Sequence, residues 1–473
     1  MKATRQDALK LLMDASECLA DIEHAGIRVD TEYLNRTLAE TADKISRGQA
    51  KLRTHSLYEK WRRAYGERTN LGSREQLAKM VFGKEGLNLP SKGMLTATGR
   101  VKADVAALEH LDHPFVKKYL QIEKLKKAHG TYLTGIHREV CNGYLRPSFN
   151  INLAATYRLS SSNPNFQNMP IRDPFIGELI RRCFIARNGH QLVEIDYVAI
   201  EVRVAACYHR DPAMIEYIKD PSKDMHRDMA AQIYMVPPDG VEKMVRFAAK
   251  SYFVFAQFYG DYYLHCAKGL WSAIDRLSLQ YKGKSLKEHL ARKGISKLGA
   301  CDPEQDARPG TFEYHVKKVE EDFWGRRFQK YANWKKTYHA KQQARGYFDT
   351  FTGFRIPGYH KRNDVINYGT QCDASQCTLK SCILLNKALK KRQMKSRIVG
   401  IIHDSIVGDV HTDEIQDYLS LADNIMTRRI PKLWPWIIVP LEIEVDVSPP
   451  GGSWFDKKPW VELGTNLYNW GPK

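Results

Sequence analysis

Two short apolar strands, each leading to an aspartate, constrain the fold of this chain more than any other feature. Residues 192–195 are mostly apolar and lead into Asp196, after which helical periodicity begins. Further along, apolar residues 401–402 and 406–407 flank a polar triplet with Asp404 at its centre, the pattern of a hairpin that turns at Asp404. Most of the chain between them has the periodicity of helices. Strands that share one sheet but are separated by helices predict an α+β fold, in which a helical lobe interrupts the sheet.

Charge and cysteine content narrow the class of protein. The 73 Lys and Arg against 54 Asp and Glu give a formal net charge of +19. This excess favours a polyanionic partner, because neutralising phosphates releases counterions; a merely basic protein is the alternative. The sequence contains neither a membrane-length apolar run nor the apolar core of a secretion signal. The nine cysteines form no CxxC pair, which predicts reduced thiols in a cytoplasmic compartment, without a zinc site.

Residues 261–310 have the composition of an insertion. They contain several glycines and prolines, and residues 261–300 carry eight Lys or Arg against three Asp or Glu. A solvated elaboration is the simpler interpretation of this segment. The functional interpretation is an additional contact with DNA or a binding site for a partner protein.

The two aspartates suit metal-assisted phosphoryl transfer, although each also has an ordinary structural explanation. Asp196 could simply cap a helix, and Asp404 could simply occupy a turn. Phosphoryl transfer needs positioning and charge neutralisation, for which carboxylates at the exposed ends of buried strands are well placed. The neighbouring motifs favour metal-assisted phosphoryl transfer.

Four ordered motifs resemble those of the family A DNA polymerases, the group of bacterial DNA polymerase I and many phage replicases. Residues 157–172 are similar to the signature at the entrance of the palm, residues 196–201 to motif A, Arg246, Lys250 and Tyr259-Gly260 to motif B, and His403-Asp404 to motif C. The resemblance implies a right-hand polymerase with an antiparallel palm sheet, helical fingers and a helical thumb. It places the thumb and N-terminal helical region at 1–145, the first part of the palm at 146–215, the fingers at 216–345, and the second part of the palm with the C-terminal tail at 346–473.

The resemblance also implies an activity: a template-directed DNA polymerase that adds deoxynucleotides to a primer 3′-hydroxyl by two-metal-ion catalysis. Asp196, Asp404 and the backbone carbonyl of Tyr197 would hold two Mg²⁺ ions, with Mn²⁺ able to substitute. Lys250 would join the two aspartates as a catalytic residue. The expected partners are primer–template DNA and deoxynucleoside triphosphates.

Other residues would bind the nucleotide or the DNA. Arg246 and Lys250 stand four apart on one helix face and would grip the triphosphate, while Glu201 beside Tyr259 would exclude a 2′-hydroxyl. The nucleotide-binding residues implied are Glu201, His226, Arg246, Lys250, Phe255 and Tyr259. Those implied for DNA are Arg158, Asn165, Gln167, Asn367, Gln371 and His403, of which Arg158, Gln371 and His403 would check the minor groove of the new pair. Solvated helix charges, caps and surface amides are the ordinary alternatives.

Two motifs depart from the family pattern. The family spaces its motif B lysine and aromatic residue four apart, whereas Phe255 lies five beyond Lys250. We therefore expect a one-residue insertion between them, carried as a π-bulge in the helix. Phe at position 255, where Tyr is the alternative, predicts poor use of dideoxynucleotides. Motif C has Ser405 where the family usually has Glu, and because a serine cannot ligate a metal strongly, no third carboxylate is expected from this position. Asp409 lies farther along the strand and is interpreted as structural.

Proofreading is not expected from this sequence, and two rival functions stay open. Asp21 and Glu23 imitate the Asp-x-Glu of a 3′–5′ exonuclease, but thumb-like sequence begins too early for that domain, so a helix surface is the better interpretation. A separate exonuclease or a processivity factor is then a candidate partner, and a phage or mobile-element origin is our guess. The rivals are a non-catalytic DNA-binding derivative of the fold and a transferase that uses RNA templates or ribonucleotides.

Overall fold

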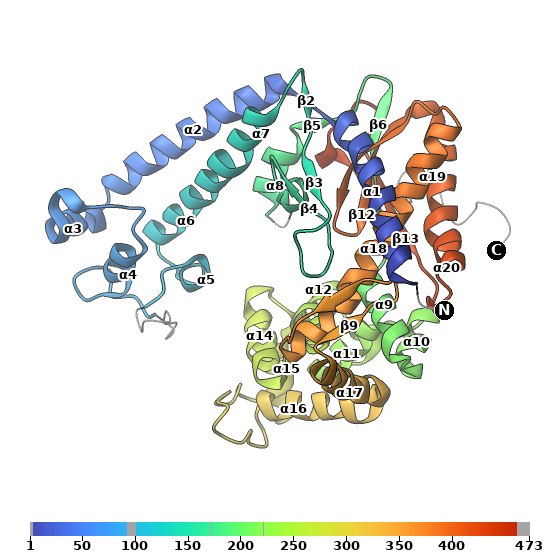
Figure 1. Ribbon diagram of the computed structural model, residues 1–473. Coiled ribbons are helices and arrows are strands. Elements are labelled where there is room, and N and C mark those ends of the chain that lie inside the picture. Colours follow the sequence, from blue (N-terminus) through green and yellow to red (C-terminus); the bar gives the residue numbers. More distant parts are fainter. Residues whose placement is uncertain (1–2, 92–100, 172, 221, 461–473) are drawn as a thin grey trace.

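The computed structural model describes residues 3–91, 101–171, 173–220 and 222–460, and a five-stranded antiparallel sheet lies at its centre (Figure 1). Arg172, the last residue of the palm-entrance motif, lies outside the described residues. The strand order is β11-β12-β6-β13-β14, with bounds Arg397–Ile402, Ser405–His411, His190–Tyr197, Ile443–Val447 and Lys458–Pro459. The α+β fold expected from the sequence is confirmed.

The central strand β6 carries Asp196 near its end. Its register pairs Asp196 with Ser405 of β12 on one side and with Glu444 of β13 on the other. The β11–β12 hairpin turns at His403 and Asp404, where His403 adopts a left-handed φ of 51°. The strand leading to Asp196 and the hairpin turning at Asp404 are therefore both as predicted.

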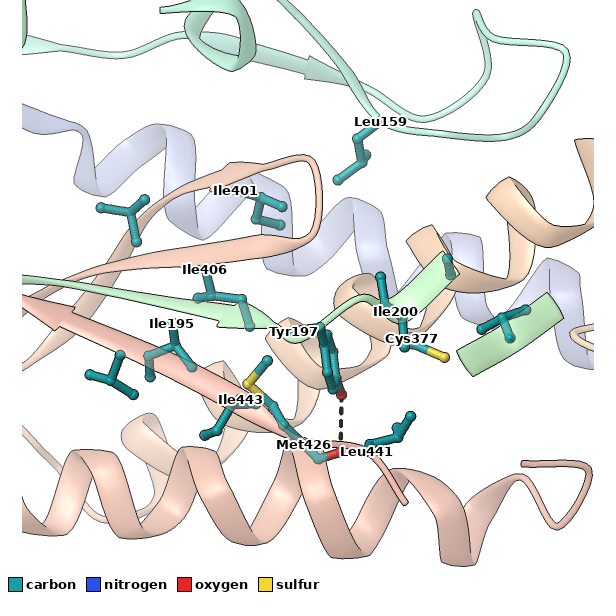
Figure 2. Close-up of a cluster of buried hydrophobic side chains, with 14 of the residues drawn as sticks. Leu159, Ile195, Tyr197, Ile200, Cys377, Ile401, Ile406, Met426, Leu441 and Ile443 are labelled. Atoms are coloured by element: carbon teal, nitrogen blue, oxygen red, sulfur yellow. Dashed lines mark hydrogen bonds between the residues drawn. The ribbon is translucent and has the colours of Figure 1, made fainter. Parts of the chain in front are cut away.

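Helices cover one face of this sheet and bury its apolar side chains. The longest, α18 (Arg362–Lys391), packs against β11 and β12, and α1 (Arg5–Ala25) packs against both α18 and β11. Figure 2 shows Ile195, Tyr197 and Ile443 in this core. The Tyr197 hydroxyl donates to the Met426 carbonyl at 3.1 Å, which ties the end of β6 to the helices below it.

The chain between β6 and β11 forms the helical lobe. Its main elements are α9 (Ile200–His209), α10 (Pro212–Lys219), α11 (Met225–Tyr234), α12 (Lys243–Ala249), η5 (Lys250–Val254), α13 (Phe255–Phe258), α14 (Tyr263–Arg276), α15 (Leu286–Arg292), α16 (Phe312–Asp322), η6 (Phe323–Arg327) and α17 (Gln329–Arg345). Helix α14 packs against α16 and buries six side chains, among them Leu264 and Leu270. The interpretation of 261–310 as a solvated elaboration is therefore wrong for α14, whose apolar residues recur at helical spacing.

The helices α2–α6, which we call the arm, have a hydrophobic core of their own. Helices α2 (Thr31–Arg53) and α6 (Pro114–Lys127) lie side by side and extend away from the sheet (Figure 1). At their far end lie α3 (Ser56–Tyr65), α4 (Arg74–Phe82) and α5 (Val105–Leu108). Trp61, Phe115 and Tyr119 are fully buried there, in a cluster separate from the main core. The arm is thus connected to the sheet mainly through two long helices.

The remaining elements connect these parts. They are β1 (Ile27–Val29), η1 (Gly66–Arg68), η2 (Ala128–Leu133), α7 (Thr134–Glu139), β2 (Tyr144–Leu145), β3 (Ser148–Asn150), β4 (Ser160–Ser162), η3 (Phe166–Asn168), α8 (Pro174–Arg181), β5 (Phe184–Ile185), η4 (Pro238–Gly240), β7 (Gln280–Tyr281), β8 (Lys284–Ser285), β9 (Tyr347–Asp349), β10 (Arg355–Pro357), η7 (Thr412–Glu414), α19 (Ile415–Asp423), η8 (Asn424–Arg429), α20 (Ile430–Leu433) and η9 (Trp454–Asp456). Among the described residues, no helix is both long enough and apolar enough to cross a bilayer. All nine cysteines are free thiols.

Candidate active site

A cleft of about 560 Å³ opens between the end of the sheet and the helical lobe. The predicted site residues that line it are Arg158, Asp196, Tyr197, Glu201, Phe255, Tyr259, Asn367, Gln371, His403 and Asp404. They come from β6, α9, α13, α18 and the β11–β12 turn, together with the segment before β4. The fold therefore gathers residues that are far apart in the sequence around one cavity.

Two acidic side chains mark the sheet side of this cleft. Asp404 lies in the turn next to Ser405, whose register partner is Asp196, so the two aspartates occupy neighbouring positions at the same end of the sheet. The Asp196 carboxylate is reached by solvent, but the surrounding protein limits its hydration. This burial, reinforced by Asp404, Glu194 and Glu444, raises the pKa of Asp196 to about 7. Burial also raises the pKa of Asp404, against the opposing influence of Arg158 and His403.

The donor atoms at this position fit a hard divalent cation. Asp196 and Asp404 each lack a Lys or Arg ion-pair partner within the described part of the chain. Their mutual repulsion would be offset by a cation held between them. Carboxylate and backbone carbonyl oxygens are the ligands Mg²⁺ prefers, and it commonly keeps several waters and takes few protein ligands. Consistent with this, no three Asp, Glu, His or Cys side chains among the described residues are grouped closely enough to share one ion.

Glu201, Arg158 and Tyr259 form a hydrogen-bonded triad at the side of the cleft. Glu201 lies in the first turn of α9, which begins after Ala199 in a left-handed conformation. The Tyr259 hydroxyl donates to Glu201 Oε2 at 2.5 Å, and Arg158 Nη2 donates to Glu201 Oε1. These contacts hold the carboxylate between two side chains, which makes Glu201 a rigid wall of the cavity.

The motif B helix contains the π-bulge expected from the sequence. Helix α12 ends at Ala249, residues Lys250–Val254 are π-helical, and the Phe255 amide donates to the Lys250 carbonyl five residues back. The extra residue is taken up within this turn, so the flanking helical segments keep their faces. The predicted bulge is confirmed, and it lets both Phe255 and Tyr259 line the cleft.

Two of the three predicted phosphate-binding residues, Lys250 and His226, lie beside the Phe255 ring, and the third, Arg246, is paired with Asp224. The Lys250 ammonium is 5.2 Å from the ring centroid, and the His226 ring meets it edge-on at 5.7 Å. Burial, together with Arg246 and Lys250, lowers the pKa of His226 to about 4, so this histidine is neutral at pH 7. Arg246 Nε donates to the Asp224 carboxylate at 2.6 Å. Asp224 was not singled out in the sequence, where only its place before α11 could have suggested a capping role.

The two remaining predicted residues lie outside the cleft lining. Asn165 accepts a hydrogen bond from the Ser161 hydroxyl at 3.2 Å. Gln167 is buried in η3, and its amide donates to the Ile401 carbonyl at 3.5 Å. Gln167 thus contacts the β11–β12 hairpin, whereas Asn165 is held by β4, and the contact of both residues with DNA stays a prediction.

Sequence reasoning missed Glu444, the neighbour of Asp196 on β13. The alternation of acidic and apolar residues at 441–447 could have revealed it, because Glu442, Glu444 and Asp446 occupy every second position of a strand. Without the register, however, that pattern gives no partner for Glu444.

A central antiparallel sheet, a helical lobe and two carboxylates at one end of the cleft between them agree with the polymerase fold that the sequence motifs indicate. Residues 39–275 match the model of DNA polymerase family A. The thermostable DNA polymerase I of Thermus thermophilus is 30% identical over 456 residues, covering 94% of this chain and 47% of the relative. DNA polymerase I of Chloroflexus aurantiacus is 27% identical, covering 94% of this chain and 42% of the relative.

A solved structure agrees with these relatives. The POL domain of Pol1 from M. smegmatis, in complex with DNA primer-template and dNTP, superimposes with a TM-score of 0.71 at 26% identity, covering 94% of this chain and 70% of the other. This chain belongs to the family A DNA polymerases. It spans about half the length of the curated relatives that it matches, corresponding to their polymerase module. These relatives are bacterial, so the guess of a phage or mobile-element origin has no support from them.

Proposed function

We propose that this chain is a template-directed DNA polymerase that adds deoxynucleotides to a primer 3′-hydroxyl. The observation that carries the proposal is that Asp196 and Asp404, two carboxylates without a Lys or Arg ion-pair partner among the described residues, share one cleft with Phe255, beside which Lys250 lies. A binding module would need neither the carboxylates nor the cations. Membership of the family and the likeness to a domain solved with DNA primer-template and dNTP support the same activity.

Asp196, Asp404 and the carbonyl of Tyr197 would hold two Mg²⁺ ions, or Mn²⁺ in their place. When bound, such ions lower the pKa of the attacking hydroxyl and neutralise charge on the leaving pyrophosphate. The protein contributes the fixed positions of its carboxylates. Asp196 is held by the strand pairs on either side of β6, and Asp404 is held by the hairpin turn.

Arg246, Lys250 and His226 would bind the triphosphate of the incoming nucleotide. Phosphate oxygens would replace the Asp224 carboxylate as the partner of Arg246, and Lys250 would stay beside the Phe255 ring. A neutral His226 can donate one hydrogen bond without adding to the repulsion among these cations. The Phe255 ring would support the base and sugar of the nucleotide.

The triad of Glu201, Arg158 and Tyr259 would select the deoxyribose sugar. A carboxylate fixed by two hydrogen bonds cannot withdraw to admit a 2′-hydroxyl, so it discriminates by steric exclusion. Asn367 and Gln371 project from one face of α18 into the same cleft and, with Arg158 and His403, would contact the DNA at the new pair. These contacts would test the geometry of the pair and not its sequence.

The domain assignment follows from these roles. The arm would act as the thumb, the central sheet as the palm, and the helical lobe as the fingers, with boundaries near residues 145, 215 and 345. Correct pairing would close the lobe and bring Arg246 and Lys250 towards the aspartates, a case of induced fit. A processivity factor or a separate exonuclease is a candidate further partner.

Primer extension tests the proposal directly. The natural chain is given a labelled primer on a DNA template with Mg²⁺ and all four deoxynucleotides, beside the variants Asp404→Ala and Asp413→Ala. Asp413 is a matched control, because its side chain is 86% exposed in a turn outside the cleft. We expect extension by the natural chain and Asp413→Ala, and a loss of about 1,000-fold or more in Asp404→Ala.

Duplex binding, measured by fluorescence anisotropy on the same proteins, separates the outcomes. If none of them extends the primer but all bind the duplex, the chain is a non-catalytic DNA-binding derivative and the proposal fails. Equal extension by the natural chain and Asp404→Ala would exclude Asp404 from the metal site.

A further inference from the structure

One face of the central sheet carries a row of acidic residues. On β6 these are Glu194 and Asp196, and their register partners on β13 are Asp446 and Glu444. Because side chains alternate along a strand, these four share a face, while Ile195 and Val445 between them are buried in the core. The row therefore consists of two cross-strand pairs of like charge, an arrangement that destabilises a sheet unless something neutralises it.

The pair farther from the cleft is neutralised within the protein. Lys457 Nζ lies 2.7 Å from Glu194 and 2.8 Å from the Asp446 carboxylate. The Trp454 indole also donates to Glu194 at 2.7 Å. Lys457 thus contacts both acids, and Arg181 adds a second positive charge that acts on the same pair, so two cations face two carboxylates.

The pair at the cleft end has no such neutralisation. Within the described residues, neither Asp196 nor Glu444 receives a Lys, Arg or His side chain as an ion-pair partner. Asp404, in the turn next to Ser405, adds a third negative charge beside them. The same sheet face therefore changes from a neutralised pair to an unneutralised one within two residues.

The other neighbour of Asp196 cannot serve as the third carboxylate. Ser405 pairs with Asp196 across β12 as Glu444 does across β13. Its hydroxyl has two acceptors within the protein, the Ile402 carbonyl at 3.0 Å and the Glu194 carboxylate at 3.4 Å. Asp196 thus has an alcohol on one side and a carboxylate on the other, at equivalent positions in the two flanking strands.

We infer that Glu444 supplies the third carboxylate of the metal site, from the strand opposite Ser405. The inference rests on the proposed function, since it assigns a positioning residue to the same site. Because no three acidic, His or Cys side chains of the described residues are grouped for one ion, Glu444 would not bind the ion directly. It would act as a positioning residue that orients what binds the ion beside Asp196.

Metal binding without turnover gives the first test. Mn²⁺ binding is measured by electron paramagnetic resonance on the natural chain, Glu444→Gln, Asp446→Asn and the double variant Ser405→Glu/Glu444→Gln. Asp446→Asn is the matched control, because it removes one negative charge from the same strand face but from the pair that Lys457 already serves. We expect Glu444→Gln to weaken Mn²⁺ binding by about 10-fold, the usual effect of losing a residue that orients a metal ligand.

The double variant distinguishes this role from a merely structural one. A glutamate at position 405 returns a carboxylate to the other side of Asp196, so it restores Mn²⁺ binding in the absence of Glu444. A Glu444→Gln protein that binds Mn²⁺ as tightly as the natural chain overturns the inference, and so does equal weakening in Asp446→Asn. Circular dichroism on each variant confirms that the fold is retained.

The Mg²⁺ dependence of primer extension separates this inference from the proposed function. If the natural chain extends primers, Glu444→Gln is expected to need about 10-fold more Mg²⁺ for half-maximal extension. Unchanged Mg²⁺ dependence contradicts the inference but leaves the polymerase activity standing. If the natural chain does not extend primers, the proposed function fails, and the Mn²⁺ measurement still decides the role of Glu444.

Discussion

At the scale of single residues, the charge on Asp196 couples stability and metal binding to pH. Its pKa is raised from 3.8 to about 7 by burial and by the neighbouring carboxylates. Between these values the folded chain holds a proton at Asp196 that the unfolded chain has lost. Stability without metal therefore falls as pH rises from about 4 to 7, because the unfolded state binds fewer protons there.

We predict that Asp196→Asn removes this fall in stability between about pH 4 and pH 7. In EDTA, the variant should melt at a higher temperature than the natural chain at pH 7 and at the same temperature near pH 4. In the natural chain, apparent Mg²⁺ affinity should rise about tenfold per pH unit below pH 7, because protons and metal compete for one carboxylate. Calorimetric melting and Mg²⁺ titrations from pH 5 to 8 check both parts, and a pH-independent affinity would contradict the raised pKa.

A second residue-scale prediction concerns Glu201. Its carboxylate is fixed by Tyr259 and Arg158, so Glu201→Ala opens the space for a 2′-hydroxyl. Ribonucleotide use relative to deoxynucleotide use should rise about 10- to 200-fold, the range for removing one steric contact from a pocket. Single-nucleotide incorporation kinetics measure this ratio. Glu216→Ala, at a glutamate that is 64% exposed, should leave the ratio unchanged.

Single residues also show where sequence reasoning succeeds and where it stops. The grouping of Asp196, Glu201 and Asp404 around one cleft could be predicted because each lies in a short local motif. Glu444 and Asp224 could not, because their importance comes from partners far away in the sequence: Asp196 across a sheet register, and Arg246 on another helix. A strand pattern predicts a face, but pairing between distant strands decides which residues meet on it.

At the scale of elements, the π-turn of Lys250–Val254 is the most informative piece. Its existence followed from counting residues between Lys250 and Phe255, since the flanking helices must keep their faces. The packing of α14 did not follow from its sequence. The glycines and lysines of the whole segment 261–310 indicated a solvated elaboration, whereas the burial of Leu264 and Leu270 against α16 determines the place of α14. Composition averages over a whole segment, so it does not reveal apolar residues that recur on one face of a helix.

Deleting Ser251 tests the π-turn. Removing the one extra residue should restore regular α-helical bonding from Lys250 onward while both flanking faces stay in place. We expect primer extension to stay within about tenfold of the natural chain, because Ser251 is only partly buried. Inserting an alanine after Ser251 instead should rotate Phe255 by about 100° away from the cleft and abolish extension. Equal losses in both variants would show that the bulge itself is required.

At the scale of the whole molecule, the two separate cores predict two unfolding transitions. Trp61 is fully buried in the core of the arm, where its indole donates to Gln76 at 2.8 Å. Trp61→Ala should destabilise the arm by about 3–5 kcal/mol and leave the sheet core unchanged. Hydrogen exchange should quicken in α2–α6 but not in α18 or β6. Met13→Ala, at an exposed methionine of α1, is the control. Faster exchange throughout would mean that the two cores unfold together.

The overall architecture was the part most accessible to prediction. The hydrophobic periodicity predicted separated strands and a helical lobe, and motifs in a fixed order indicated the family. How far the arm extends could not be predicted, because that depends on the pairing of α2 with α6 over their length. Tertiary contacts between distant helices leave only a weak trace in either helix alone.

The length of the arm has a consequence for copying accuracy. Helix α2 has 23 residues, which at about 1.5 Å each makes it about 34 Å long. That is close to one full turn of duplex DNA, about ten base pairs. If the arm acts as the thumb, it is long enough to reach a mispair made about ten additions earlier. Such an enzyme would respond to the duplex that it has already made. A mispair several positions behind the primer end could then slow the next nucleotide addition even when the newest pair is correct.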